Sequence, residues 1–289
     1  MAMASDIMNE SLAAPSSWPA GVSFAQRLWS HRDPRVKDWG GINDARFMFP
    51  LLATYIYFVK IGGPRWMKNR PAFELKLPIL LYNLFMVVAN ALFVAKFLRH
   101  SYVGGGYSFF CQGIDYSADD ENTMTLLNTA WWYAFVRIGD FLDTIFFVLR
   151  KKDSHVTFLH VVHHFLVVFD CWVWMNFGHD GQVILGVCVN ASVHVIMYAY
   201  YFLAALGPEV RKYLWWKRYL TTIQIVQMIC VVMHMQIPLF YDCGYPSAFC
   251  IIEILQLCFG IALFVNFYLK TYKTRSSGVS ELAKARKTE

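Results

Sequence analysis

Hydrophobic stretches alternate with short polar connections along most of this chain. A helix that crosses the hydrocarbon core of a bilayer needs about 20 mainly apolar residues, so the pattern predicts several membrane-spanning helices. Seven are expected, near 46–61, 77–98, 124–149, 157–177, 182–206, 219–240 and 247–269. The first is the weakest, because it is short and contains Pro50, whose ring disfavours the interior of a helix.

The composition indicates a chain whose surroundings are mostly lipid. Hydrophobic residues make up 57% of the 289 residues and charged residues 16%, against about 45–50% and about 25% in soluble domains. The 24 Phe, 16 Tyr and 10 Trp side chains are more than a soluble core of this size can bury. We therefore expect an all-α integral membrane protein. Residues 45–272 form one membrane domain, preceded by a segment at 1–44 and followed by a basic tail at 273–289.

The distribution of Lys and Arg predicts the orientation of the bundle. Basic residues concentrate in the connections at 60–76, 150–152 and 211–218 and in the tail, whereas the opposite connections contain only Lys96 and Arg99. Because cytosolic loops are enriched in Lys and Arg, the tail is expected in the cytosol and, with seven spans, the N-terminal segment in the lumen. The net charge of +6 suits a membrane surface or an anionic substrate, and nucleic acid is not expected as a partner.

Polar side chains, most of them ionisable, lie inside four consecutive predicted spans. Such groups are costly in a bilayer, so each one is a candidate functional residue. Their spacing of three or four residues places the members of each group on one helix face. The groups are Arg137, Asp140 and Asp143; His160, His163 and His164; Asn190, His194, Tyr198 and Tyr201; and Thr221, Gln224 and Gln227. Together they predict a polar-lined chamber inside a seven-helix bundle, as in a membrane enzyme or a transporter.

The histidines are compatible with two kinds of enzyme chemistry. A His-x-x-His-His run is one of the boxes of metal-dependent membrane desaturases and hydroxylases, but such a centre needs several boxes and this chain has one, so no metal is expected. Imidazole acting as general base, general acid or acyl-accepting nucleophile fits better, with Asn and Gln side chains as donors to a developing oxyanion. A seven-span receptor and a transporter are the alternatives without catalysis.

Several longer motifs are more specific. They are His160-x-x-His163-His164, Asn190-x-x-x-His194-x-x-Met197-Tyr198-x-Tyr200-Tyr201 and Thr221-x-x-Gln224-x-x-Gln227, with the flanking runs Asp33-Pro34-Arg35-Val36, Phe73-Glu74-Leu75-Lys76, Leu149-Arg150-Lys151-Lys152 and Tyr213-Leu214-Trp215-Trp216-Lys217. Over residues 31–275 the chain resembles the elongation of very long chain fatty acids (ELOVL) family. One box differs, because the family pattern Lys-x-x-Glu-x-x-Asp-Thr here reads Arg137-x-x-Asp140-x-x-Asp143-Thr144. The charges are kept but their geometry changes.

This resemblance implies a 3-oxoacyl-CoA synthase, which condenses a long-chain acyl-CoA with malonyl-CoA and releases CoA and CO2. It implies no cofactor beyond these substrates, a multi-pass position in the endoplasmic reticulum membrane, an acyl tunnel within the bundle, and other enzymes of the elongation cycle as partners. A homodimer is left open.

The resemblance also assigns roles to the polar residues. The expected catalytic residues are His160, His163, His164, His194, Asp140 and Asp143. The expected substrate-binding residues are Arg137, Asn190, Tyr198, Tyr201, Gln224 and Gln227, together with Arg150, Lys151, Lys152, Lys217 and Arg218 for the phosphates of CoA. His163 is favoured as the acyl acceptor, with His194 assisting decarboxylation, although the assignment between the two histidines stays open.

The cysteines predict one disulfide. Five of the seven, Cys171, Cys188, Cys230, Cys250 and Cys258, lie within apolar spans. Only Cys111 and Cys243 fall in connections, both predicted to be lumenal, and the lumen is oxidising, so these two are expected to pair.

The end of the chain carries a further signal. Arg286 and Lys287 stand at the fourth and third positions from the end, and they resemble a dilysine-type retrieval signal for the endoplasmic reticulum.

Overall fold

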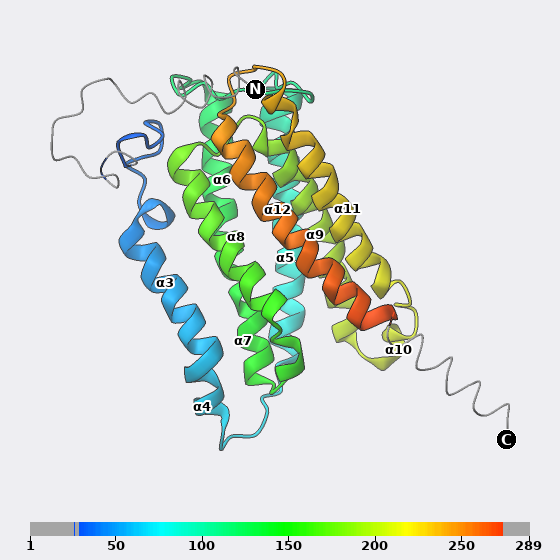
Figure 1. The fold of residues 1–289 in the computed structure, drawn as a ribbon. Helices are drawn as coiled ribbons and strands as arrows, with labels where there is room; N and C mark the ends of the chain where they lie inside the picture. Colours follow the sequence, from blue (N-terminus) through cyan, green and yellow to red (C-terminus); the bar gives the residue numbers. More distant parts are fainter. Residues whose placement is uncertain (1–25, 27–28, 274–289) are drawn as a thin grey trace.

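The computed structural model describes residue 26 and residues 29–273, which form a bundle of long helices (Figure 1). The helices are α3 (Ala45–Tyr57), α4 (Gly63–Met67), α5 (Lys76–Leu98), α6 (Glu121–Gly139), α7 (Phe141–Leu149), α8 (Phe158–Phe177), α9 (Val183–Leu206), α10 (Pro208–Arg211), α11 (Lys217–Met235) and α12 (Ser247–Tyr268). Short turns of 3-10 or π-helix are η1 (Gly41–Asn43), η2 (Phe58–Gly62), η3 (Arg99–Val103), η4 (Asp153–His155), η5 (Ile237–Leu239) and η6 (Leu269–Lys273). The described part contains no strand, which confirms the all-α class. Most of the predicted N-terminal segment and nearly all of the tail, with Arg286 and Lys287, lie outside the described residues.

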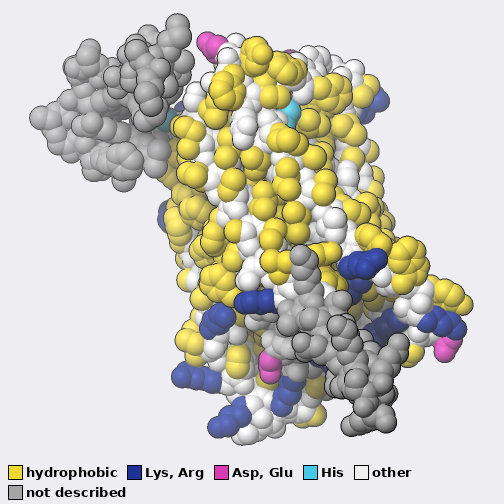
Figure 2. Space-filling model, turned by 45° about the vertical axis from the view of Figure 1, so that its right-hand side comes forward, with side chains coloured by type: hydrophobic (Ala, Val, Ile, Leu, Met, Phe, Trp, Pro, Cys, Tyr) yellow, Lys and Arg dark blue, Asp and Glu magenta, His cyan; other side chains and the backbone are white. Residues whose placement is uncertain are grey.

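Six helical segments are long and apolar enough to cross a membrane. They are Ala45–Met67, Lys76–Val103, Phe158–Phe177, Val183–Leu206, Lys217–Leu239 and Ser247–Tyr272. Hydrophobic side chains cover most of the face of the bundle seen in Figure 2. An exterior of this kind is stable in hydrocarbon and not in water, so the chain is a multi-pass integral membrane protein.

The predicted third span, 124–149, is two helices rather than one. α6 ends at Gly139 and α7 begins at Phe141, with α7 below α6 in Figure 1. At the junction the backbone N–H of Asp140 bonds to the carbonyl of Arg137, and the N–H of Asp143 to the carbonyl of Asp140, so the helix tightens to three-residue turns. Neither part is long and apolar enough to count among the six, so the described residues do not show a seventh span.

Pro50 does not interrupt the first span. α3 continues through it and, by way of η2 and α4, reaches Met67, so this span is longer than predicted. Pro50 lies in the second turn of α3, where it removes only one N–H from the helical ladder. Asp44 caps the N-terminus of α3, because its side chain accepts a hydrogen bond from the backbone N–H of Arg46.

The helices enclose one interior. α5 packs along α9, α6 lies against α5 and α8, and α11 contacts both α9 and α12. α3 lies at the edge of the bundle and contacts α8. Large side chains such as Met48, Tyr55, Phe97 and Val168 fill the core between these helices. The polar groups of α6, α8 and α9 therefore face the same interior.

One end of the bundle, at the top of Figure 1, is held by a covalent bond. Cys111, in the connection before α6, is bonded to Cys243, in the connection between α11 and α12, with their Cα atoms 5.9 Å apart. We call this the disulfide end. The connections that carry the basic residues lie at the opposite end, which we call the basic end; Lys and Arg gather there in Figure 2.

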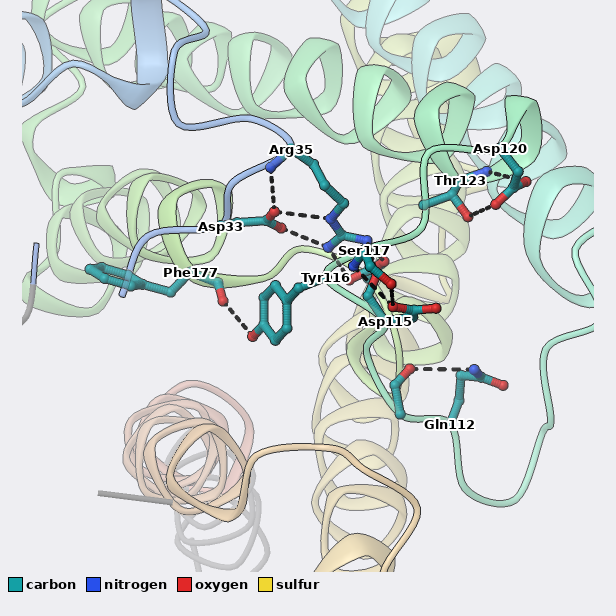
Figure 3. A network of polar contacts seen from close by, with 11 residues as sticks. Asp33, Arg35, Gln112, Asp115, Tyr116, Ser117, Asp120, Thr123 and Phe177 are labelled. Carbon is teal, nitrogen blue, oxygen red and sulfur yellow. Dashed lines mark hydrogen bonds and ion pairs between the residues drawn. The ribbon is translucent and has the colours of Figure 1, made fainter. Parts of the chain in front are cut away.

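A buried ion pair network closes the disulfide end (Figure 3). The guanidinium of Arg35 lies 2.6 Å from Asp33 and 2.8 Å from Asp180, and it also donates to the carbonyl of Asp115. The hydroxyl of Tyr116 donates to the carbonyl of Phe177 at the end of α8. The segment before α3 is thereby joined to the connections that precede α6 and α9.

Candidate active site

The break between α6 and α7 positions a buried charged group. Arg137, in the last turn of α6, is fully buried, and its guanidinium lies 3.2 Å from the carboxylate of Asp140. It also donates to Asn90 of α5 at 2.9 Å and stacks over the ring of Tyr133 at 4.8 Å. Its remaining contact is with Nδ1 of His194 on α9, at 2.8 Å. A planar guanidinium can hold these partners at once, whereas an ammonium group has no such fixed fork.

Two tyrosines hold the carboxylates of Asp140 and Asp143. The hydroxyl of Tyr198, fully buried on α9, lies 2.9 Å from Asp140 and 2.7 Å from Asp143. Tyr82 of α5 reaches Asp143 and the Tyr198 hydroxyl, both at 3.2 Å. The two hydroxyl hydrogens are enough to give each carboxylate one donor. Side chains of α5 and α9 therefore hold the two carboxylates at the α6–α7 break in place.

The histidine box occupies the first turns of α8. Thr157 caps this helix by accepting a hydrogen bond from the backbone N–H of His160. The rings of His160 and His164 lie 4.3 Å apart, and those of His163 and His164 lie 5.5 Å apart. Nε2 of His160 is 2.9 Å from the hydroxyl of Thr144 on α7. Among the described residues no hydrogen bond involves the ring of His163 or His164, so their nitrogens are available to a substrate.

The histidines of α8 and α9 belong to one site. His194 lies within electrostatic range of His163 and His164, and Arg137 lies within range of all three. His194 is 8% exposed, and its ring lies 5.9 Å from that of Tyr198. The structure thus brings together the six residues expected to be catalytic, from α6, α7, α8 and α9.

The expected polar ligands of α9 and α11 take different positions. The amide oxygen of Asn190 accepts a hydrogen bond from Tyr133 at 3.2 Å. Gln224 makes a weak contact with the sulfur of Met197, and the amide oxygen of Gln227 is buried without a hydrogen bond in the described part of the chain. Tyr201 is 40% exposed, and its ring lies 6.0 Å from that of Tyr198.

The basic residues expected to bind CoA lie at the basic end, and three of them lie near His155. Arg150, Lys151 and Lys152 follow α7, and Lys217 and Arg218 begin α11. The pKa of His155, in η4, indicates that several of these cations lie near it. Its pKa is lowered by partial burial and by the positive charges of Lys217, Lys152 and Arg150. Cations from two distant parts of the chain therefore share one region beside the histidine box.

Sequence reasoning missed several contributors to this site. Asn90 and Tyr82 lie on α5, for which no site residue was predicted, and Tyr55 of α3 reaches the Thr144 hydroxyl at 3.0 Å. Asn90 carried a signal, because an amide inside an apolar span is costly unless it has a partner. The tyrosines carried none, since their rings are ordinary in a membrane protein.

A second, half-buried acidic pair lies away from the site. Asp170 on α8 accepts a hydrogen bond from Gln256 on α12, and Glu253 lies one turn before Gln256. The described residues contain no group of three or more His, Cys, Asp or Glu side chains arranged to hold a metal ion.

Comparisons with known proteins agree on one family. The sequence profile of the ELO (GNS1/SUR4) family matches residues 42–280. Very long chain fatty acid elongase 4 of Mus musculus is 38% identical over 268 residues, which cover 90% of this chain and 85% of that protein. Very long chain fatty acid elongase 7 of Rattus norvegicus is 40% identical over 253 residues, covering 87% and 89%. Very long chain fatty acid elongase 2 of Mus musculus is 36% identical over 253 residues, covering 88% and 85%. With a matching profile over most of its length and relatives above 30% identity, the chain belongs to the ELO (GNS1/SUR4) family.

Proposed function

We propose that this protein is a condensing enzyme of fatty acid elongation. It joins a long-chain acyl-CoA to malonyl-CoA and gives 3-oxoacyl-CoA, CoA and CO2. The observation that carries the proposal is that His163, whose ring makes no hydrogen bond among the described residues, lies near the Arg137–His194 pair. The chain belongs to a family whose named relatives are very long chain fatty acid elongases. No group other than the two substrates is needed for the chemistry below.

In the first step His163 is the nucleophile. A ring nitrogen attacks the thioester carbonyl of acyl-CoA, the C–S bond breaks, and CoA leaves with the proton that the imidazole gives up. The free nitrogens of His163 support this role, because a nucleophile must be able to reach the carbonyl carbon. His160, held by Thr144, and His164 line the approach and can carry the proton to the leaving sulfur.

In the second step malonyl-CoA is decarboxylated. The C–C bond breaks, CO2 leaves, and its electron pair passes into the thioester as an enolate. The enolate carbon attacks the acyl group, the C–N bond to His163 breaks, and the imidazole recovers a proton, so one proton is taken up overall. His194 fits the support of this enolate. Its Nδ1 accepts from Arg137, which leaves the hydrogen on Nε2 free to be donated to the enolate oxygen.

Asp140, Asp143 and the two tyrosines act as positioning residues in this scheme. They hold the α6–α7 break and thereby Arg137, which in turn orients His194. Arg137 is therefore assigned to orientation in addition to substrate binding. Asn190 and Gln227, whose amide oxygen is buried and unsatisfied in the described structure, are assigned to polar groups of the substrates.

The phosphates of CoA are assigned to Arg150, Lys151, Lys152, Lys217 and Arg218. The positive charges of Arg150, Lys152 and Lys217 around His155 support this assignment, since several cations are needed to hold several phosphates. We further propose that the protein resides in the endoplasmic reticulum, with the basic end in the cytosol and the disulfide end in the oxidising lumen. A reductase is the class of partner that must consume the 3-oxoacyl product.

Purified protein supplied with radiolabelled malonyl-CoA and acyl-CoAs of graded chain length tests the proposal. The expected result is label in a product two carbons longer than the acyl substrate, with release of CO2. Binding or movement of acyl-CoA without formation of a longer acyl chain would instead identify a receptor or a transporter.

A further inference from the structure

A groove lies on the outer side of the bundle, away from the histidines. It follows α3 where this helix faces α8, and it has a volume of about 550 Å³. Phe49, Leu52, Ala53, Ile56 and Phe165 line it, and Lys60 closes its end. None of the histidines or carboxylates of the candidate active site lines it. The groove is therefore a separate feature of the surface that faces lipid.

A second cavity, with charged and apolar lining residues, adjoins the groove at Lys60. It has a volume of about 360 Å³ and shares Lys60 with the first. Lys68 and Lys151 add two further ammonium groups, while Asp153 contributes one opposing carboxylate, so the charge of the lining is positive. An apolar channel thus ends in a cationic pocket at the basic end.

The dimensions of this composite site match one leaflet of a bilayer. From Phe49 to Lys60 the helix rises about 16 Å, close to half of the roughly 30 Å hydrocarbon core. A lipid chain that fills the groove would therefore place its headgroup at the lysines. The headgroup of a zwitterionic lipid carries its own cation, which the lysines repel, whereas an anionic headgroup gains from each lysine.

We infer that this groove and pocket, defined by α3, Phe165, Lys60, Lys68 and Lys151, bind an anionic phospholipid of the leaflet at the basic end. One acyl chain lies between α3 and α8, and the phosphate lies among the three lysines. The site is distinct from the proposed active site, and Lys151 is the residue that borders both. The inference does not depend on elongase activity and is tested by binding.

The experiment compares lipid retention by matched variants. Purified protein is reconstituted in nanodiscs of phosphatidylcholine with a minor fraction of phosphatidylserine, and the lipids that stay bound are counted by native mass spectrometry. Lys60→Gln and Lys68→Gln should each weaken phosphatidylserine retention about fivefold, as expected for the loss of one basic side chain near an anionic lipid. Arg65→Gln is the control, because Arg65 is an exposed cation of the same segment that lines neither cavity.

The apolar part is tested by filling it. Ala53→Trp should abolish the retained lipid, whereas Thr54→Trp, at the exposed neighbour that does not line the groove, should leave it in place. Helix content and elution volume establish that each variant is folded. Equal losses for Lys60→Gln, Lys68→Gln and Arg65→Gln would reduce the effect to general surface charge and overturn the site. Displacement of the lipid by stoichiometric long-chain acyl-CoA would also overturn it, by making the groove a substrate site.

Discussion

Arg137 on α6 and His194 on α9 are joined by a contact of 2.8 Å between Nη1 and Nδ1, while Nε2 of the same imidazole is 3.5 Å away. A guanidinium has only donors, so the nearer nitrogen must be the acceptor. The hydrogen of a neutral His194 is then on Nε2. In the proposed mechanism this tautomer lets Nε2 of His194 donate to the substrates, and the nucleophilic role falls to a histidine of α8.

Substitution of the proposed nucleophile separates the two steps. His163→Ala should reduce elongation to background, because the proposed acyl acceptor is then missing. Incubation with acyl-CoA alone, followed by intact-mass spectrometry, should show one added acyl group on the wild type and none on the variant. Val162→Ala, a cavity-forming change at the adjacent position, should keep the acyl adduct. An adduct on His163→Ala protein would assign the acyl group elsewhere.

The tautomer of His194 gives a second prediction. His194→Gln keeps an N–H donor and should retain part of the turnover, while His194→Ala should lose a factor of about 10²–10³, the usual effect of removing one donor to an oxyanion. Both variants should still form the acyl adduct on His163, because that step precedes decarboxylation. If the Gln variant were as inactive as the Ala variant, donation from Nε2 would not be the role of this side chain.

Arg137 and Asp140, the two residues that differ from the family box, can be tested together. Arg137→Lys alone should lower kcat about 10- to 100-fold, since a single ammonium cannot keep hydrogen bonds to both Asn90 and His194 that are worth about 1.5–3 kcal/mol each. Adding Asp140→Glu, which restores the family pattern with its longer carboxylate, should recover much of the loss. Additive losses in this double-mutant cycle would show that the two positions are not coupled.

Arg35 should be needed for stability rather than for catalysis. Burial already raises the pKa of Asp180, and the hydrogen bonds from Arg35 oppose that shift. Arg35→Gln leaves two buried carboxylates without their cation, so the free energy of unfolding should fall by about 3–5 kcal/mol. Arg46→Gln, which breaks an exposed pair with Asp44, is the matched control and should leave the melting temperature unchanged. Thermal unfolding of the detergent-solubilised variants measures both.

His155 should couple CoA binding to protons. The surrounding cations help to hold its pKa below the ordinary 6.5, so bound phosphates that neutralise them should raise it. Binding of CoA at about pH 6 should then take up protons, because the imidazole is less protonated before binding than after it. Calorimetry in buffers of different ionisation enthalpy measures this proton uptake. In His155→Gln the uptake by the imidazole is absent, and only the uptake by the phosphates of CoA remains. Identical uptake by both proteins would place CoA away from this cluster.

The sequence predicted the class of fold because lipid imposes a simple rule on length and hydropathy. Six expected spans are present. The span containing Pro50 is longer than predicted, because proline removes one backbone hydrogen bond and the turns on either side keep theirs. The break at Asp140 could not be anticipated from the spacing of Arg137, Asp140 and Asp143. A continuous helix and a helix tightened by one turn place such residues on nearly the same face.

The sequence predicted the reactive side chains of the site better than the residues that hold them in place. Histidine and acidic residues inside apolar spans stand out because their burial is expensive. Asn90 and Tyr82 escaped notice because the polar residues of α5 do not recur every three or four positions. Their importance arises only when α5 packs against α6 and α9. Long-range packing of this kind is not contained in any local pattern.

The bond between Cys111 and Cys243 ties the connection between α11 and α12 to the connection before α6. A rigid tilt of α12 about this end would displace its other end most. The segment Ser247–Tyr272 is 26 residues long. Acting as a lever about 39 Å long, it converts a tilt of about 5° into a displacement of about 3 Å at the opposite end. Such a tilt would leave the disulfide end nearly in place and widen or narrow the basic end, where Lys217 and Arg218 begin α11.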